Sequence, residues 1–203
     1  MKKLSVLFVE VLVLIAGLTG CSRNNRPAGG ELTEEEKNDL LFLREEEKLA
    51  RDVYLYAYDK YALQEFANIS SSEQRHMDAV KVLLDKYGLE DPAKPNRGEF
   101  SDSTLQQLYD NLTALVDSSQ IDALRVGATI EDLDINDIRE MKERTGKSDI
   151  LNVYNRLECG SRNHMRAYYS ALEALGVIYV AQYISQDELD VIIGSTNERC
   201  GRQ

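Results

Sequence analysis

The chain has 203 residues, 43% hydrophobic and 29% charged, which suits one soluble domain with a substantial core and is too short for two full domains. Three prolines and 12 glycines exclude a collagen-like or low-complexity chain. The formal net charge of −11 disfavours nucleic acid and anionic membrane surfaces as binding partners, because like charges repel.

The first 20 residues are expected to be a lipoprotein signal peptide rather than part of the fold. Lys2 and Lys3 precede an apolar stretch over residues 4–18, and a Leu-Thr-Gly-Cys run ends at Cys21. A basic head, an apolar middle and small residues before a cleavage point are typical of an export signal. The run resembles a bacterial lipobox, which implies cleavage before Cys21 and lipidation of that residue. Glu10 interrupts the apolar stretch, so an uncleaved N-terminal anchor is the alternative; both anchor the protein to the membrane outside the cytoplasm, in the cell envelope.

Residues 21–31 are expected to form a flexible tether, because they are polar and contain glycine and proline. The helical domain is expected to occupy residues 32–203. Besides Cys21 it leaves two cysteines, Cys159 and Cys200. An exported protein with an even count permits one disulfide, which would fasten the C-terminal tail to a core helix. Two free thiols are the alternative.

The domain is expected to be all-α, because apolar residues recur every three or four positions along most of it. Thr33 and Glu36 predict a capping box that opens the first long helix. Ser70 or Ser71 is expected to cap the second, which ends near Gly88.

The later elements follow the same period. A short helix is expected over residues 103–117, and two long helices over residues 121–144 and 148–175. Strand-like alternation occurs only around residues 177–183. A last short helix starts at Ser185, with Glu188 completing a second capping box.

All four long helices carry polar residues near the middle of their apolar stripes. These are Glu47, then Glu73 and His76, then Glu131, then Ser161 and His164. A buried charge is costly unless it is paired or binds a metal. Packing the four helices together would bring these residues to one level, where Glu-x-x-His spacing aims two side chains at one ion. The halves of the chain also echo each other, since SEQRHMDAV (72–80) aligns with GSRNHMRAY (160–168).

These motifs resemble the ferritin-like superfamily. EKLARDVY (47–54) is similar to the first-helix ligand motif of rubrerythrins. In particular, the chain resembles domain of unknown function 2202, a family of ferritin-like bundles, in the stretches REEEKLARDVY (44–54), SEQRHM (72–77), IEDLDI (130–135) and GSRNHMRAY (160–168). The resemblance covers roughly residues 36–195 and implies a ferritin-like four-helix bundle. We expect an extra short helix between the second and third helices of the bundle, and a short helix at the C-terminal end of the domain.

The resemblance also implies a set of metal ligands. They are Glu47, Glu73, His76, Glu131 and His164. Tyr54, two turns beyond Glu47, is then a hydrogen-bond donor to a ligand or a radical-prone neighbour. The chain departs from the pattern at Ser161, where a full site has Glu. Asp134 is the better substitute ligand, since Glu158 lies about 120° from His164 around its helix. A mononuclear site, an asymmetric pair and a solvent ligand all stay open. Gly160 permits a bulge or a close approach of helices beside the site.

Glutamate and histidine ligands suit iron, manganese or zinc, and the resemblance favours iron. An iron centre would make the protein an oxidoreductase of the ferroxidase or peroxidase type. With no Cys-x-x-Cys pair in the sequence, it would need an external electron donor. The alternative is a non-catalytic envelope lipoprotein whose polar core is a structural network or holds a structural metal. The sequence leaves the oligomeric state open, a homodimer included.

Overall fold

The structure, a computed structural model, describes residues 31–201. The expected signal peptide, Cys21 and the tether up to residue 30 lie outside the described residues. Within the described part the chain forms six helices and no strand. They are α1 (Glu34–Tyr61), α2 (Gln64–Tyr87), α3 (Ser103–Val116), α4 (Gln120–Arg144), α5 (Ser148–Ala174) and α6 (Gln186–Ile193). The all-α prediction is confirmed, and the strand-like residues 177–183 form an irregular segment.

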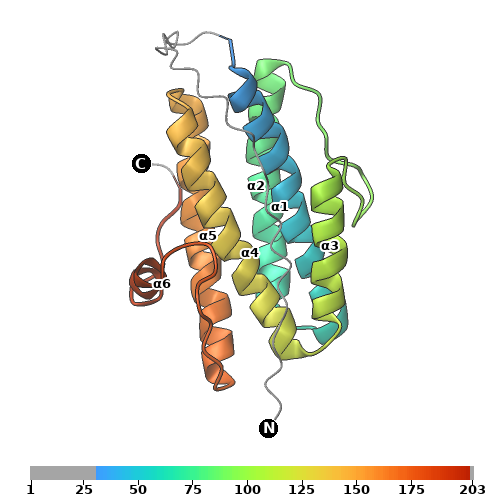
Figure 1. Cartoon of the computed structure of the whole chain (residues 1–203), viewed down its shortest axis with the longest axis vertical. Coiled ribbons are helices and arrows are strands. Elements are labelled where there is room, and N and C mark those ends of the chain that lie inside the picture. The colour runs from blue at the N-terminus through green and yellow to red at the C-terminus, as the bar shows by residue number, and fades with distance from the viewer. Residues whose placement is uncertain (1–30, 202–203) are drawn as a thin grey trace.

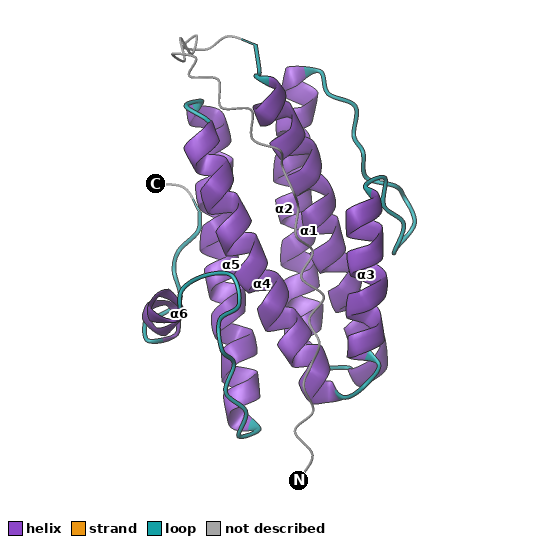
Figure 2. Ribbon diagram, in the orientation of Figure 1, coloured by secondary structure: helices purple, strands orange, loops and turns teal. Residues whose placement is uncertain are grey.

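The four long helices lie side by side (Figure 1). α1 packs against α2 and α4, and α5 packs against α4 and α2. α3 lies against α1 and α4 on one flank, and α6 lies against α5 on the other (Figure 2). The two short helices therefore lie outside the group of four.

The predicted starts at Thr33 and Ser185 are confirmed, whereas the predicted capping box at Glu188 and the predicted cap of the second helix are wrong. The capping box at Thr33 is confirmed, since Glu36 N donates to Thr33 Oγ1 at 3.1 Å and Thr33 N donates to Glu36 Oε2 at 2.9 Å. Ser185 caps α6, although the Glu188 side chain pairs with Arg139 instead of completing a box.

The predicted cap at Ser70 or Ser71 is wrong, because α2 begins six residues earlier, at Gln64. Ala62 adopts a left-handed conformation, with φ 52°, which ends α1 and lets the chain reverse within two residues. Both serine hydroxyls instead donate to the carbonyl of Ala67 inside the helix. A hydroxyl that bonds back along its own helix no longer marks a helix start.

Two apolar clusters fill the core and leave a layer between them. One cluster joins Leu40 of α1, Leu83 of α2 and Ile138 of α4. The other joins Val53, Phe66 and Leu124 with neighbouring residues of α3, α5 and α6. The mid-helix polar residues lie between these clusters, so the fold delivers them to one level.

The connection between α2 and α3 is fixed by charged residues of α1. Glu45 accepts hydrogen bonds from Ser101 N at 2.6 Å and Asp102 N at 2.9 Å, and Lys48 donates to Asn96 O at 2.9 Å. Lys48 is fully buried, and its ammonium group also pairs with Asp52 and lies over the Phe100 ring. These bonds hold residues 96–102 against α1.

No described helix is both long enough and apolar enough to cross a membrane.

Candidate metal centre

Five of the predicted ligands meet in the polar layer. They are Glu47 from α1, Glu73 and His76 from α2, Glu131 from α4 and His164 from α5. The three glutamates are each 2% exposed, and the histidines are 8–9% exposed. Neighbouring helices thus enclose the group almost completely.

The five side chains form two overlapping groups, each able to hold one metal ion. Glu47, Glu73 and His76 make the first, and Glu73, Glu131 and His164 make the second, with the ligand atoms of each group within 4.8 Å of one another. Glu73 belongs to both. Its Oε2 lies 2.7 Å from His76 Nδ1, and its Oε1 lies 2.8 Å from His164 Nδ1. One carboxylate therefore faces both histidines, as a carboxylate that bridges two ions must.

The remaining carboxylates complete each group from the opposite side. Glu47 Oε2 lies 3.2 Å from His76 Nδ1, and Glu131 Oε2 lies 3.3 Å from His164 Nδ1. The two imidazole rings stack with their centroids 5.5 Å apart. Each half of the centre thus offers one nitrogen and one carboxylate of its own besides the shared Glu73.

Burial and mutual charge shape the ionisation of the group. Burial raises the pKa of Glu47 to about 8, against the opposing effect of His76, and burial also raises the pKa of Glu131. For Glu73, burial alone would raise the pKa, but His164 and His76 outweigh it and lower it. Burial would lower the pKa of His164, but Glu73 and Glu131 raise it to about 10. At Glu47 and Glu131 burial thus outweighs the attraction of the neighbouring histidines.

The donor set fits a metal in one further respect. Glu47 Oε1 is buried and receives no hydrogen bond within the described structure. A buried polar atom without a partner is costly, and cation coordination removes that cost. Three carboxylates and two imidazoles suit divalent iron, manganese or zinc.

Gly160 holds the His76 ring in place. A Cβ atom at Gly160 would lie 2.6 Å from His76 Nε2 and 2.7 Å from its Cε1. The absent side chain lets α5 approach α2 so closely that the imidazole rests on its backbone. Since Nε2 faces α5, Nδ1 is turned toward Glu47 and Glu73, and the close approach expected at Gly160 is what the structure shows.

Tyr54 fixes the second half of the centre. Its hydroxyl donates to Glu131 Oε1 at 2.6 Å, so Oε2 is the oxygen that faces His164. The Tyr54 ring packs against Tyr168, with centroids 5.3 Å apart, and Tyr168 in turn fills the space over Gly127. Packing of Tyr54 and Tyr168 in the apolar core therefore fixes the hydroxyl that holds Glu131.

The three other candidate residues, Ser161, Asp134 and Glu158, lie outside the two ligand groups. Ser161 Oγ bonds Asp134 Oδ2, and Asp134, though 6% exposed, is not in either ligand group. Glu158 points away from the layer, since it pairs with Lys142 at 2.7 Å and with Arg162 at 3.0 Å. The position where the ferritin-like resemblance predicts a glutamate is thus held by a serine that bonds Asp134.

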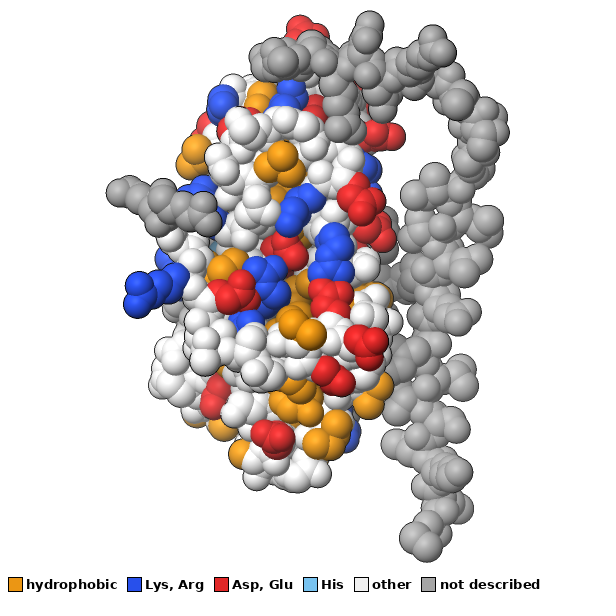
Figure 3. Space-filling view, turned by 90° about the vertical axis from the view of Figure 1, so that its left-hand side faces the viewer, with side chains coloured by type: hydrophobic (Ala, Val, Ile, Leu, Met, Phe, Trp, Pro, Cys, Tyr) orange, Lys and Arg blue, Asp and Glu red, His pale blue; other side chains and the backbone are white. Residues whose placement is uncertain are grey.

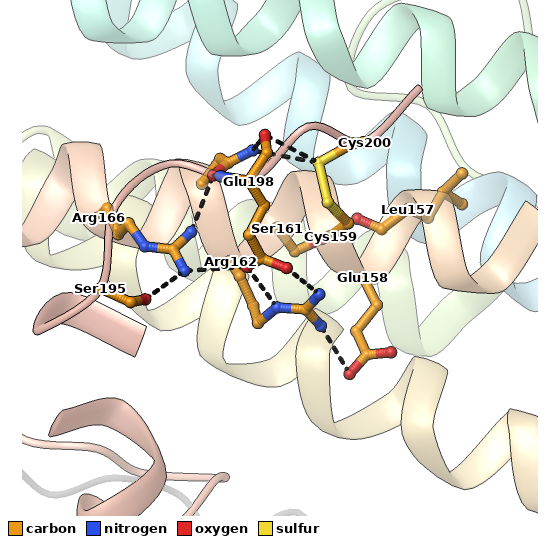
Figure 4. The surroundings of a disulfide bond; sticks show 10 residues. Leu157, Glu158, Cys159, Ser161, Arg162, Arg166, Ser195, Glu198 and Cys200 are labelled. Atoms are coloured by element: carbon orange, nitrogen blue, oxygen red, sulfur yellow. Dashed lines mark hydrogen bonds and ion pairs between the residues drawn. A yellow bond between two sulfur atoms is a disulfide. The ribbon is translucent and has the colours of Figure 1, made fainter. Parts of the chain in front are cut away.

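Cys159 and Cys200 are joined by a disulfide, with Cα atoms 5.5 Å apart (Figure 4). The bond fastens residues 194–201, here called the C-terminal strap, to α5. Glu198 adds ion pairs to Arg162 at 2.6 Å and Arg166 at 2.9 Å. Acidic and basic side chains are interspersed on this face of the molecule (Figure 3).

Sequence reasoning missed one acidic residue that positions the segment before α6. Asp132 is fully buried next to Glu131 and accepts hydrogen bonds from Tyr179 OH at 2.8 Å, Gln182 N at 2.6 Å and Ile184 N at 2.8 Å. In the sequence Asp132 lies one residue beyond the apolar stripe of its helix. An exposed aspartate could occupy the same position, so the sequence does not predict its burial.

A family model described as "Uncharacterized protein domain (DUF2202)" matches residues 36–196. Uncharacterized protein MJ0754 of Methanocaldococcus jannaschii is 53% identical over 169 residues, which span 83% of this chain and 91% of that protein. The crystal structure of hypothetical protein MJ0754 from Methanococcus jannaschii DSM 2661 matches with a TM-score of 0.82 at 50% identity, covering 87% of this chain and 99% of that one. The helical architecture described above is thus one that a crystal structure also contains.

Proposed function

We propose that this chain, which belongs to the family of the uncharacterized protein domain DUF2202, is a ferritin-like four-helix bundle that binds iron in its core. The observation that carries the proposal is the position of Glu73, with one carboxylate oxygen on each of the two histidines. That arrangement favours a pair of ions over a single ion. The resemblance of the motifs to the ferritin-like superfamily favours iron over manganese and zinc.

The chain's own residues would prepare the site for redox chemistry. Glu73, His76 and Glu47 would hold one ion, and Glu73, His164 and Glu131 would hold a second. Two bound Fe(II) ions would supply two electrons, which with two protons reduce dioxygen to hydrogen peroxide, or hydrogen peroxide to two waters. The apolar clusters above and below exclude bulk water. Tyr54 donates a hydrogen bond to one oxygen of Glu131, whereas Glu47 Oε1 accepts none.

Metal analysis tests this proposal directly. The purified protein is loaded with Fe(II) without oxygen, desalted and analysed by inductively coupled plasma mass spectrometry, and we expect about two irons per chain. Glu73→Gln, which removes the shared ligand charge, should retain less than half of that iron. Glu173→Gln makes the same chemical change at an exposed position of α5 and should behave as the wild type.

Oxygen consumption by the loaded protein then tests the oxidoreductase activity. Failure of the wild type to retain iron, manganese or zinc would refute the metal centre and favour a structural network of histidine–carboxylate pairs. If the protein retains iron that does not react with oxygen or peroxide, the metal has a structural role and the oxidoreductase proposal is refuted.

We further propose that the protein is an envelope lipoprotein anchored through Cys21, with an external electron donor. The disulfide between Cys159 and Cys200 supports an oxidising compartment. Mass spectrometry of the protein purified from membranes tests the anchor, because lipidation adds diacylglycerol to Cys21 and removes residues 1–20. An unmodified N-terminus in the soluble fraction would refute it.

A further inference from the structure

The disulfide between Cys159 and Cys200 lies beside the metal centre, where the C-terminal strap meets α5 (Figure 4). Cys159 directly precedes Gly160, so their Cα atoms are about 3.8 Å apart. A Cβ atom at Gly160 would lie 2.6 Å from His76 Nε2, which means that the Gly160 backbone touches the imidazole ring. One peptide unit and one van der Waals contact therefore connect the disulfide to a ligand of the proposed centre.

The strap has enough other bonds to stay in place when the disulfide opens. Glu198 pairs with Arg162 at 2.6 Å and with Arg166 at 2.9 Å. Asn163 Nδ2 donates to Glu198 O at 3.0 Å, and Glu198 N donates to Asn163 Oδ1 at 2.8 Å. The two thiols formed by reduction would thus remain neighbours and could close the bond again.

Cys200 is placed for exchange with a thiol from solvent. It is half-buried, whereas Cys159 is only 8% exposed, so an attacking thiolate reaches Cys200 first. Cys200 Sγ accepts a hydrogen bond from Asn163 Nδ2 at 3.1 Å, and it lies 3.7 Å from Glu198 O. The amide stabilises a thiolate and the carbonyl accepts from a thiol, so the sulfur keeps a partner in every state of the exchange.

We propose that Cys159 and Cys200 form a dithiol that supplies two electrons to the metal centre, so that the protein reduces hydrogen peroxide with electrons from thiols. This role rests on the proposed function for its destination, the centre at Glu73. It also gives the chemical class of the external electron donor, which is a thiol that exchanges with Cys200.

The reaction balances in atoms and electrons. The S–H bonds of Cys159 and Cys200 break and one S–S bond forms, which releases two electrons and two protons. The electrons reach the centre by way of Gly160 and His76, and with two protons they break the O–O bond of hydrogen peroxide to give two waters. An external thiol then attacks Cys200 and forms a mixed disulfide, and a second external thiol restores the dithiol and leaves the donor oxidised.

Counts of thiols and of Fe(II) test this role in the wild type. The full-length protein is reduced, freed of reductant, loaded with Fe(II) without oxygen and mixed with one equivalent of hydrogen peroxide. Alkylation and peptide mass spectrometry count the thiols of Cys159 and Cys200, and ferrozine counts Fe(II). We expect both thiols to be lost while Fe(II) stays near its starting amount. Metal-free protein should lose its thiols about tenfold more slowly, because buried thiols react poorly with peroxide.

A Cys159→Ser/Cys200→Ser variant removes the proposed source of electrons and keeps every ligand. Its iron content reports whether the variant folds, and the same peroxide should convert its Fe(II) to Fe(III). Ser195→Ala is the matched control in the strap, since it removes a hydroxyl that bonds Arg166 and leaves both sulfurs in place. That control should lose its thiols and keep its Fe(II) as the wild type does.

The outcomes distinguish this role from the proposed function. If the wild type keeps its thiols while Fe(II) becomes Fe(III), the dithiol is not the electron source and the iron centre stands. Equal rates of thiol loss with and without metal would overturn the role as well, because peroxide would then attack the cysteines directly. Failure to retain iron before peroxide is added would refute the proposed function, and the role of the dithiol with it.

Discussion

The two halves of the centre have the same plan and differ in how firmly they are held. The α1–α2 half supplies Glu47, Glu73 and His76, and Glu47 keeps an oxygen without a hydrogen bond. In the α4–α5 half, Tyr54 fixes Glu131, and a disulfide fastens the helix that carries His164. The first half is therefore the adaptable one, and the second is the anchored one.

The difference between the two halves is already visible where the two similar sequence segments are aligned. Residues 72–80 align with residues 160–168, so Glu73 corresponds to Ser161 and Ser72 to Gly160. The shared carboxylate comes from α2 alone, and the equivalent place on α5 holds a hydroxyl that fixes Asp134. The two helix pairs thus differ at equivalent positions, since α2 supplies a carboxylate shared by both ligand groups and α5 supplies a hydroxyl that holds Asp134.

Removing the disulfide should have the largest effect on stability. The Cys159–Cys200 bond closes a loop with a sequence separation of 41, so its reduction should lower the free energy of unfolding by about 4 kcal/mol. Iron content should not change, because the ion pairs of Glu198 still hold the strap. Urea unfolding with and without reductant measures the loss. A Cys159→Ser/Cys200→Ser variant should be insensitive to reductant, and equal midpoints for the oxidised and reduced wild type would contradict the prediction.

Gly160→Ala should damage the first half selectively. The new methyl group would lie 2.6 Å from His76 Nε2, so the ring must move, at a cost of about 3 kcal/mol. With His76 displaced, we expect the iron content to fall by half while the ion at His164 is retained. Ser72→Ala, at the equivalent position of the first half, is the matched control. If both variants retain wild-type iron and stability, His76 does not depend on the close approach of α5.

Tyr54→Phe should leave Glu131 with an oxygen that accepts no hydrogen bond, as Glu47 already has in the first half. Loss of the hydrogen bond to Glu131 should cost about 2 kcal/mol in urea unfolding of the metal-free protein. The affinity of the second ion should fall about tenfold. Tyr168→Phe is the matched control, because that buried hydroxyl bonds no carboxylate. Equal affinities for the two variants would mean that Glu131 is held by packing alone.

Ser161→Ala should have a smaller effect, about 1 kcal/mol, because it removes one hydrogen bond to the buried Asp134. Ser70→Ala is the control on α2, since the Ser70 hydroxyl bonds only the carbonyl of Ala67. Chemical denaturation of the two metal-free variants gives the comparison. A greater loss from Ser70→Ala would show that the serine on α5 has no special role.

Hydrophobic period alone predicts most of the fold, because each long helix buries a stripe and its polar interruptions stand out against it. The same reasoning fails where the partner is distant in sequence. Lys48 and Asp132 are buried by segments that lie some 50 residues away, and no local sequence pattern predicts such a contact.

The predicted cap at Ser70 is wrong for a local reason. A serine inside a helix and a serine at a helix start cannot be told apart from the neighbouring sequence alone. Glu158 was a candidate ligand by distance along its helix, yet three basic side chains draw it outward.

The smallest effect concerns the strap that anchors the second half, and it depends on pH. The hydrogen bond from Arg162 is the largest cause that lowers the pKa of Glu198 from 4.5 to about 2. Because the folded-state value is depressed, the stabilisation is present above pH 4.5 and is lost as the pH falls toward 2. Glu198→Gln should therefore unfold at a slightly lower temperature than the wild type at pH 7, and the two midpoints should converge by about pH 2. A difference that persists at low pH would assign the strap's stability to the disulfide and to the hydrogen bond that Glu198 N donates to Asn163 Oδ1.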